Sequence, residues 1–160
     1  VLQESSVTAG SLFHNIAGAS KISMDQAMEA AEDAAFAEDI REMPMGLHTM
    51  LPEGGGTLSG GQKQRLMIAR SLASNPSIVM FDEATSALDN RTQKIVSDSL
   101  KLRKITRLVI AHRLSTIIDA DKIIVLDAGK IIEEGNYEEL MQLDGVFASM
   151  AKRQMASEGG

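Results

Sequence analysis

Two short stretches decide the fold, Leu58-Ser59-Gly60-Gly61-Gln62 and Ile78-Val79-Met80-Phe81-Asp82-Glu83. The first predicts a glycine-rich turn that opens a helix over residues 60–73, and Asn75-Pro76 ends that helix. The second predicts a buried apolar strand that runs directly into two adjacent carboxylates. Together they favour an α/β fold in which polar groups lie at the carboxyl edge of a parallel sheet.

The rest of the chain downstream supports this fold class, because helical and strand-like segments alternate. We expect helices near residues 90–102, 115–120, 137–143 and 145–155, and strands near residues 108–111 and 122–127. The turn Asp127-Ala128-Gly129-Lys130 predicts an antiparallel hairpin into a further strand at 131–134.

Upstream of the glycine turn the composition changes. Residues 23–42 are rich in Ala, Met and Glu, with Ser23 and Gln26 spaced as a capping box, and predict one helical segment that Pro44 ends. A glycine-rich loop follows at 47–57. We therefore divide the chain into an entry region, a small all-α subdomain, a core, and a tail of C-terminal helices, which span residues 1–10, 11–57, 58–136 and 137–160.

Composition excludes several classes of protein. The 160 residues carry a net charge of -6, which argues against a broad nucleic-acid footprint. Cysteine is absent, which excludes disulfides and thiolate metal sites. No apolar run approaches the roughly 18 residues that cross a bilayer. The chain begins with Val rather than Met, and we expect it to be a piece of a longer protein.

Ser59-Gly60-Gly61 lies where a loop becomes a helix, and such an end presents unpaired backbone N–H groups and the positive end of the helix dipole. Glycine lets a phosphate approach these groups, and the Ser59 hydroxyl can donate one more hydrogen bond. A plain Ser N-cap is the simpler interpretation of the same three residues. The neighbouring motifs favour the anion-binding interpretation.

Asp82 and Glu83 are placed to divide the work of phosphoryl transfer. Asp82 is assigned as an oxygen ligand of Mg²⁺ and Glu83 as the group that orients or deprotonates water. His112 follows the next strand, so we expect it on the same sheet edge, within reach of a γ-phosphate oxygen. Asp89 fits either a helix N-cap or a site residue. The alternative for the Asp-Glu pair is a solvated turn.

Together these motifs resemble those of the nucleotide-binding domain of ATP-binding cassette (ABC) transporters, in the exporter branch. The resemblance identifies a signature sequence, a Walker B strand, a D-loop, a histidine switch and a Q-loop entry, at residues 58–62, 78–83, 86–89, 111–116 and 1–4. In the loop resembling the one before the signature, Pro52 stands where the family usually has Gly. The amino-acid sequences of segments 11–16 and 43–47 are most similar to those of peptide or bacteriocin exporters.

The resemblance implies ATP and Mg²⁺ as ligands, with Gln3 as a further metal and water contact. It implies a head-to-tail dimer with a second ATP-binding domain, in which Ser59, Gly60, Gly61 and Gln62 contact the partner's nucleotide. A transmembrane domain would hold the assembly at the cytoplasmic face of the membrane. No G-x-x-x-x-G-K-[ST] loop occurs in the 160 residues, so we expect no ATPase activity from them alone.

Two other interpretations remain. An SMC-type or repair ATPase also carries a signature loop before Walker B, but it predicts long heptad helices that this sequence lacks. A non-catalytic interaction module would dock a partner through residues 11–57. Such a module has no need of Asp82, Glu83 and His112, which speaks against it.

Overall fold

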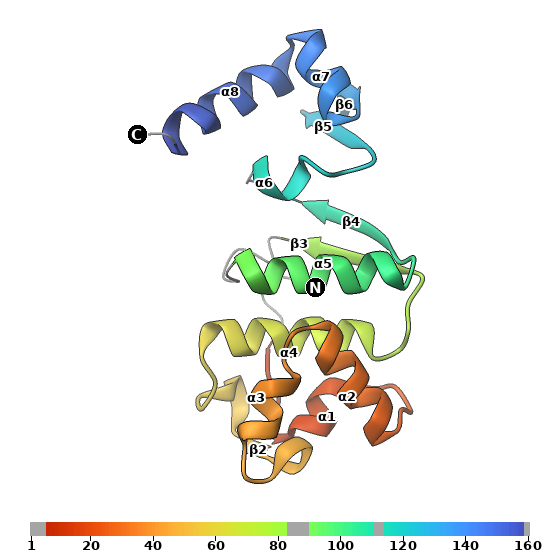
Figure 1. The fold of residues 1–160 in the computed structure, drawn as a ribbon, viewed down its shortest axis with the longest axis vertical. Helices are drawn as coiled ribbons and strands as arrows, with labels where there is room; N and C mark the ends of the chain where they lie inside the picture. The colour runs from red at the N-terminus through yellow and green to blue at the C-terminus, as the bar shows by residue number, and fades with distance from the viewer. Residues whose placement is uncertain (1–5, 83–89, 111–113, 159–160) are drawn as a thin grey trace. The chain divides into compact units, whose positions relative to one another are not determined.

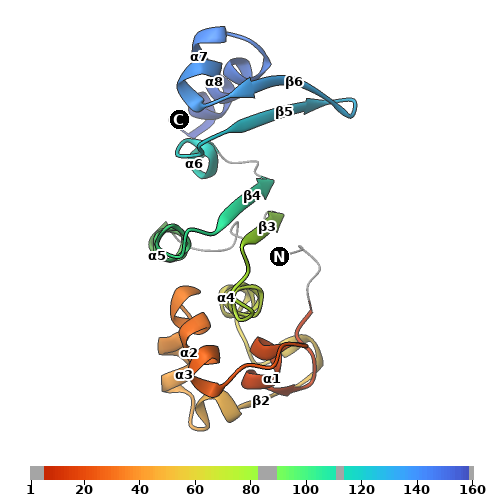
Figure 2. The same ribbon diagram turned by 90° about the vertical axis from the view of Figure 1, so that its right-hand side faces the viewer.

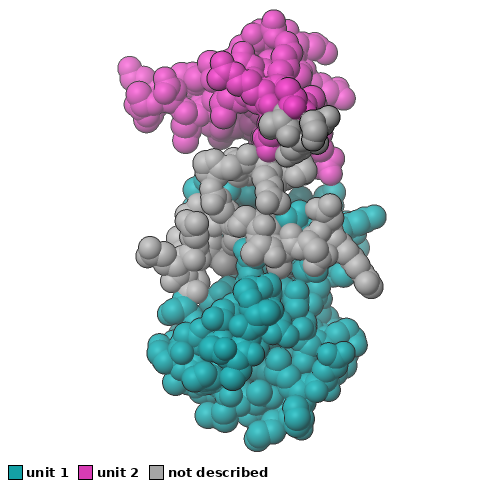
Figure 3. Space-filling view, turned by 90° about the vertical axis from the view of Figure 1, so that its left-hand side faces the viewer, with its two compact units in different colours: residues 1–110 teal, residues 111–160 magenta. Residues whose placement is uncertain are grey.

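The structure is a computed structural model, and it describes residues 6–82, 90–110 and 114–158. The chain separates into two compact units, residues 1–110 and 111–160, which Figure 3 colours separately.

The first part of unit 1 is helical. It contains α1 (Leu12–Ala17), α2 (Met24–Asp33), α3 (Ala37–Glu42) and the single turns η1 (Gly46–His48) and η2 (Glu53–Gly55). A short antiparallel pair joins its ends, since β1 (Gly10–Ser11) lies against β2 (Met50–Leu51). The capping box predicted at Ser23 and Gln26 is present at the start of α2, which confirms that boundary.

The single helical segment predicted over residues 23–42 is wrong, because the chain breaks between α2 and α3. Ala35 adopts a left-handed conformation with φ of 53°, and the Phe36 N–H donates to the carbonyl of Ala31 at 2.7 Å. The break brings Phe36 into the core with no exposed surface. Burial of this aromatic ring overrides the helical periodicity of the alanines.

The helix that follows the glycine turn, α4 (Gly60–Leu72), agrees with the predicted range and forms the centre of the core of unit 1. Figure 1 shows α1 and α2 packed against it. The fully buried side chains at this junction are large and apolar, and they include Leu12, Ile16, Phe36, Ile40, Leu66, Ile68 and Leu72. The signature helix is therefore held by the helical segment that precedes it in the sequence.

A parallel pair of strands completes unit 1. In it β3 (Ile78–Asp82) pairs with β4 (Thr106–Ile110), with α5 (Asn90–Leu102) as the crossover. This confirms parallel pairing and the α/β class, although β4 begins two residues before the predicted strand. One face of β3 is buried through Val79 and Phe81, whereas Ile78 and Met80 on the other face are 63% and 59% exposed.

Unit 2 contains α6 (Leu114–Ile117), β5 (Ile123–Asp127), β6 (Lys130–Gly135), α7 (Tyr137–Leu143) and α8 (Val146–Glu158). The predicted hairpin is confirmed, since β5 and β6 are antiparallel and lie side by side in Figure 2. The Glu133 carboxylate accepts from the N–H groups of Val146 and Phe147, which satisfies the start of α8. A second small core lies around Leu140 and Phe147.

None of the helices in the described ranges combines the length and the apolar composition that crossing a membrane requires.

Candidate functional site

Ser59 occupies the N-cap of α4. Its Oγ accepts from the Gln62 N–H at 3.2 Å, and the Gln62 Oε1 accepts from the Ser59 N–H at 2.9 Å. This reciprocal capping box confirms the simpler interpretation of Ser59, namely the N-cap. The turn can still bind an anion, because the backbone N–H groups of Gly60 and Gly61 lie in the first turn of the helix, where no intrahelical carbonyl accepts from them.

Asp39 anchors the first turn of α4 to α3. Its two carboxylate oxygens accept from the Gln62 Nε2 at 2.9 Å and from the Arg65 Nη2 at 2.8 Å. The Arg65 and Asp39 side chains are only 16% and 20% exposed, so this ion pair is shielded from water. Sequence reasoning missed Asp39, since nothing in the spacing links it to residues more than twenty positions away.

Among the residues that the structure describes, none gives Gly60 or Gly61 a steric or backbone reason to be glycine. Neither residue has a positive φ, a Cβ at Gly60 would meet nothing within 4 Å, and one at Gly61 would lie at an ordinary 3.6 Å from Arg65 Nη1. A glycine inside a helix is less stable than alanine by roughly 0.5–1 kcal/mol. At the first two positions of α4 the pair gains nothing for the helix, and it leaves the amides open to a close ligand.

Asp82 is the last residue of β3 and pairs with Ile110, the last residue of β4. Because the two strands are parallel, β3 and β4 end at the same edge of the sheet, at Asp82 and Ile110. The positions of Gln3, Glu83, Asp89 and His112 lie outside the described residues, so their assigned roles stay predictions. Among the residues that the structure does describe, no group of three or more His, Asp or Glu side chains is placed to hold a metal ion.

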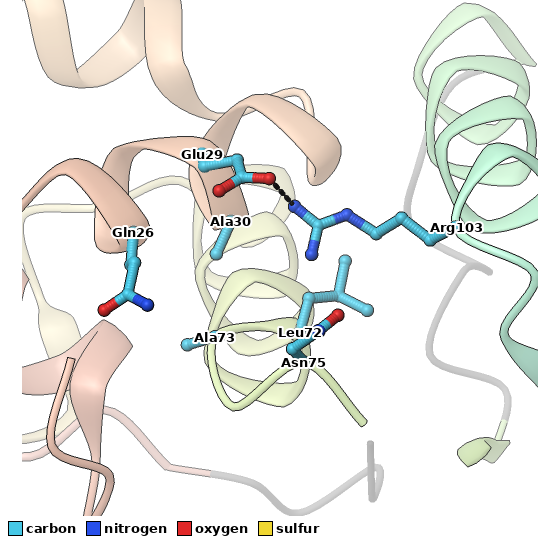
Figure 4. A pocket seen from close by; sticks show the side chains of 7 residues that line it. All are labelled: Gln26, Glu29, Ala30, Leu72, Ala73, Asn75 and Arg103. Carbon is cyan, nitrogen blue, oxygen red and sulfur yellow. Dashed lines mark hydrogen bonds and ion pairs between the residues drawn. The ribbon is translucent and has the colours of Figure 1, made fainter. Parts of the chain in front are cut away.

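An open hollow of about 350 Å³ lies at the other end of α4 (Figure 4). Arg103 is one of the residues that line it, and its Nη2 is 2.7 Å from Glu29 Oε1 and 2.5 Å from Asp33 Oδ2. Burial raises the pKa of Asp33, and the Arg103 charge acts in the opposite direction. The Glu29–Arg103 ion pair lines the hollow together with Gln26, Ala30, Leu72, Ala73 and Asn75, and this chemistry differs from that of the glycine turn.

Comparison with known proteins relates this geometry to one family. A family model described as ABC transporter matches residues 2–86. A solved structure titled "Structure of a bacterial Atm1-family ABC exporter with ATP bound" superposes with a TM-score of 0.90 at 42% identity, over 95% of this chain and 27% of that one. The arrangement of elements described above is thus shared with an exporter.

Curated relatives agree. The chain is 42% identical to an ATP-dependent lipid A-core flippase of Francisella novicida over 91% of its length, and 44% identical to an ATM1-type heavy metal exporter of Novosphingobium aromaticivorans over 98%. It is 46% identical to ABC transporter B family member 14 of Arabidopsis thaliana over 96%. It spans 25%, 26% and 13% of those proteins. The chain belongs to the ABC transporter family.

Proposed function

We propose that these residues form the signature, Walker B and switch portion of an exporter's ATP-binding domain, which hydrolyses ATP to drive transport. The observation that supports this most directly is the pair Gly60 and Gly61, which stands in the first turn of α4 and meets no steric requirement for glycine among the described residues. A ligand that approaches the amides from outside explains both glycines. In a head-to-tail dimer that ligand is the ATP held by the partner domain.

The remaining site residues serve the nucleotide of their own domain. Asp82 and Gln3 would hold Mg²⁺, for which an oxygen ligand at the end of a parallel strand is suited. Glu83 orients or deprotonates the attacking water, and His112 contacts the γ-phosphate. Asp89 would contribute to nucleotide binding or cap the helix that follows it, and the two roles are compatible. When bound, Mg²⁺ would neutralise negative charge on the phosphate oxygens.

The four-part division of the chain, with a helical subdomain at 11–57 and an ATPase core at 58–136, belongs to the same proposal. Export of a peptide or bacteriocin is also part of this proposal, and it rests only on the amino-acid sequence of residues 11–16 and 43–47. Two of the relatives named above are a lipid A-core flippase and a heavy metal exporter. A transport assay with a purified peptide, lipid and metal substrate would decide which chemical class the complete protein exports.

The first prediction concerns ATP turnover by the 160 residues alone. We expect none above the buffer background, because no G-x-x-x-x-G-K-[ST] loop is present to grip the β- and γ-phosphates. The measurement is phosphate release by the purified chain, compared with a version joined to an upstream segment that carries this loop. Turnover by the 160 residues themselves would contradict the divided site, and so would a joined version that stays inactive.

The second prediction separates the two interpretations of the glycine turn. Gly60→Ala should leave the free energy of unfolding unchanged or raise it by up to about 1 kcal/mol, because alanine is the better helix former. In the joined version it should lower ATPase activity at least about tenfold, because a methyl group obstructs phosphate approach. Urea unfolding and phosphate release measure the two effects.

Gly56→Ala is the matched control, since Gly56 follows η2 with right-handed backbone angles (φ of -56°) that alanine also adopts, and a Cβ there would sit 4.0 Å from Pro52 Cγ. It should change neither quantity appreciably. An alanine at position 60 that leaves ATPase activity at the parental level would show that the turn is only a helix cap.

A further inference from the structure

Asn15 lies at a buried polar junction in unit 1. Its side chain has no exposed surface, yet its Oδ1 accepts from the Thr8 N–H at 3.0 Å and from the Arg70 Nη2 at 2.7 Å. Its Nδ2 donates to the Thr8 carbonyl at 2.9 Å and to the Ser11 carbonyl at 3.2 Å. A fully buried amide that is satisfied in this way fixes the groups around it in one arrangement.

Arg70 brings α4 into this junction. Besides its bond to the Asn15 side chain, its Nε donates to the Asn15 carbonyl at 2.5 Å and its Nη1 to the Ser6 carbonyl at 3.2 Å. Burial lowers the pKa of Arg70, and these partners are uncharged oxygens rather than a carboxylate. The rigid fork of the guanidinium thus joins the helix to two separate segments, which a lysine cannot do with the same geometry.

Residues 6–9 are held from a second direction by the loop before α4. The Ala9 N–H donates to Glu53 Oε2 at 2.9 Å, and the Gly54 N–H donates to the Val7 carbonyl at 2.8 Å. Val7 is 2% exposed and lies so close to Gly55 that a Cβ there would come within 3.0 Å of it. This short segment therefore has a single position relative to α1, α4 and η2.

We propose that Arg70 and Asn15 are positioning residues that lock residues 6–9 onto α4. Gln3 stands three residues before Ser6 in the sequence, so the lock holds the segment that directly follows the proposed Q-loop entry, and Ser59 lies at the opposite end of α4. The 13-residue helix α4 is the rigid element that links these two positions. This inference rests on the proposed function for its catalytic consequence, but not for the lock itself.

The lock is tested on the 160-residue chain by amide hydrogen exchange. Arg70→Met keeps the aliphatic stem and removes the fork; it should speed exchange at Thr8 and Ala9 at least about tenfold, while amides of α2 change by less than about twofold. Arg70→Lys should give exchange rates at Thr8 and Ala9 between those of the parent and those of Arg70→Met. Arg41→Met is the matched control, because Arg41 pairs with Glu32 and Glu38 at the surface, and it should leave exchange at Thr8 unchanged.

The catalytic consequence is tested in the version joined to a phosphate-loop segment. Arg70→Met should lower kcat about tenfold or more with KM for ATP within about threefold, since misplacing a water-positioning group affects the chemical step. Arg70→Lys should recover part of kcat, and Arg41→Met should match the parent.

Equal acceleration of exchange at Thr8 and throughout α2 would overturn the lock, because Arg70 would then act on global stability alone. A raised KM with unchanged kcat would overturn the positioning role. If the parental joined version shows no ATPase activity, the proposed function fails while the exchange experiment still decides the lock.

Discussion

Glu83→Gln is expected to lower ATP hydrolysis by about 10²–10⁴-fold in a domain that joins these residues to a phosphate loop, with ATP binding retained. The amide is nearly the same size as the carboxylate but cannot accept a proton from the attacking water. Glu83 directly follows β3 in the sequence, and β3 ends at Asp82, opposite the end of β4 at the same sheet edge. Single-turnover hydrolysis and nucleotide binding by fluorescence titration measure the two properties separately.

Glu42→Gln is the control for this substitution, because Glu42 is an exposed residue at the end of α3 and has no assigned role. It should hydrolyse ATP at the parental rate. Hydrolysis by Glu83→Gln within a few-fold of the parent would remove Glu83 from its role. Loss of ATP binding in that variant would instead indicate that the carboxylate serves the nucleotide rather than the water.

Local signals in the sequence predicted the parts of the fold that depend on near neighbours. The capping box at Ser23, the N-cap at Ser59, the range of α4 and the turn between β5 and β6 follow from residues a few positions apart. Hydrogen-bonding side chains and turn chemistry specify such features directly. For the site, the signature turn and the strand that ends at Asp82 were predictable for the same reason.

Contacts between distant residues were not predictable in this way. Asp39 binds Gln62 and Arg65 from another helix, and Arg70 reaches Asn15 across 55 positions of sequence. Both are polar residues in helices, where the pattern alone favours a solvated surface position. Only the packing of α1 and α3 near α4 turns them into buried partners, so a single sequence gives no local signal for either.

The break after α2 shows how tertiary burial overrides helix propensity. A left-handed alanine costs roughly 1–2 kcal/mol, which is the penalty that Ala35 incurs. Burying a phenylalanine ring of roughly 150–250 Å² stabilises by about 4–6 kcal/mol at 25 cal/mol per Å². The gain at Phe36 exceeds the strain at Ala35, so the chain interrupts a sequence that is otherwise helical in pattern.

Phe36→Ala is accordingly expected to lower the free energy of unfolding of the 160-residue chain by about 3–5 kcal/mol. The substitution removes a side chain with no exposed surface from the core of unit 1 and leaves a cavity that the surrounding residues only partly fill. Urea unfolding followed by circular dichroism measures the change, with the m-value checked for constancy.

Leu102→Ala is the control for this prediction, because Leu102 is an apolar residue that is 84% exposed at the end of α5. Its truncation should change the free energy of unfolding by less than about 0.5 kcal/mol. Phe36→Leu should lie between the two, since it refills part of the cavity. A loss below about 1 kcal/mol for Phe36→Ala would mean that the break at Ala35 is held by the backbone alone, and the ring would then not be the residue that divides α2 from α3.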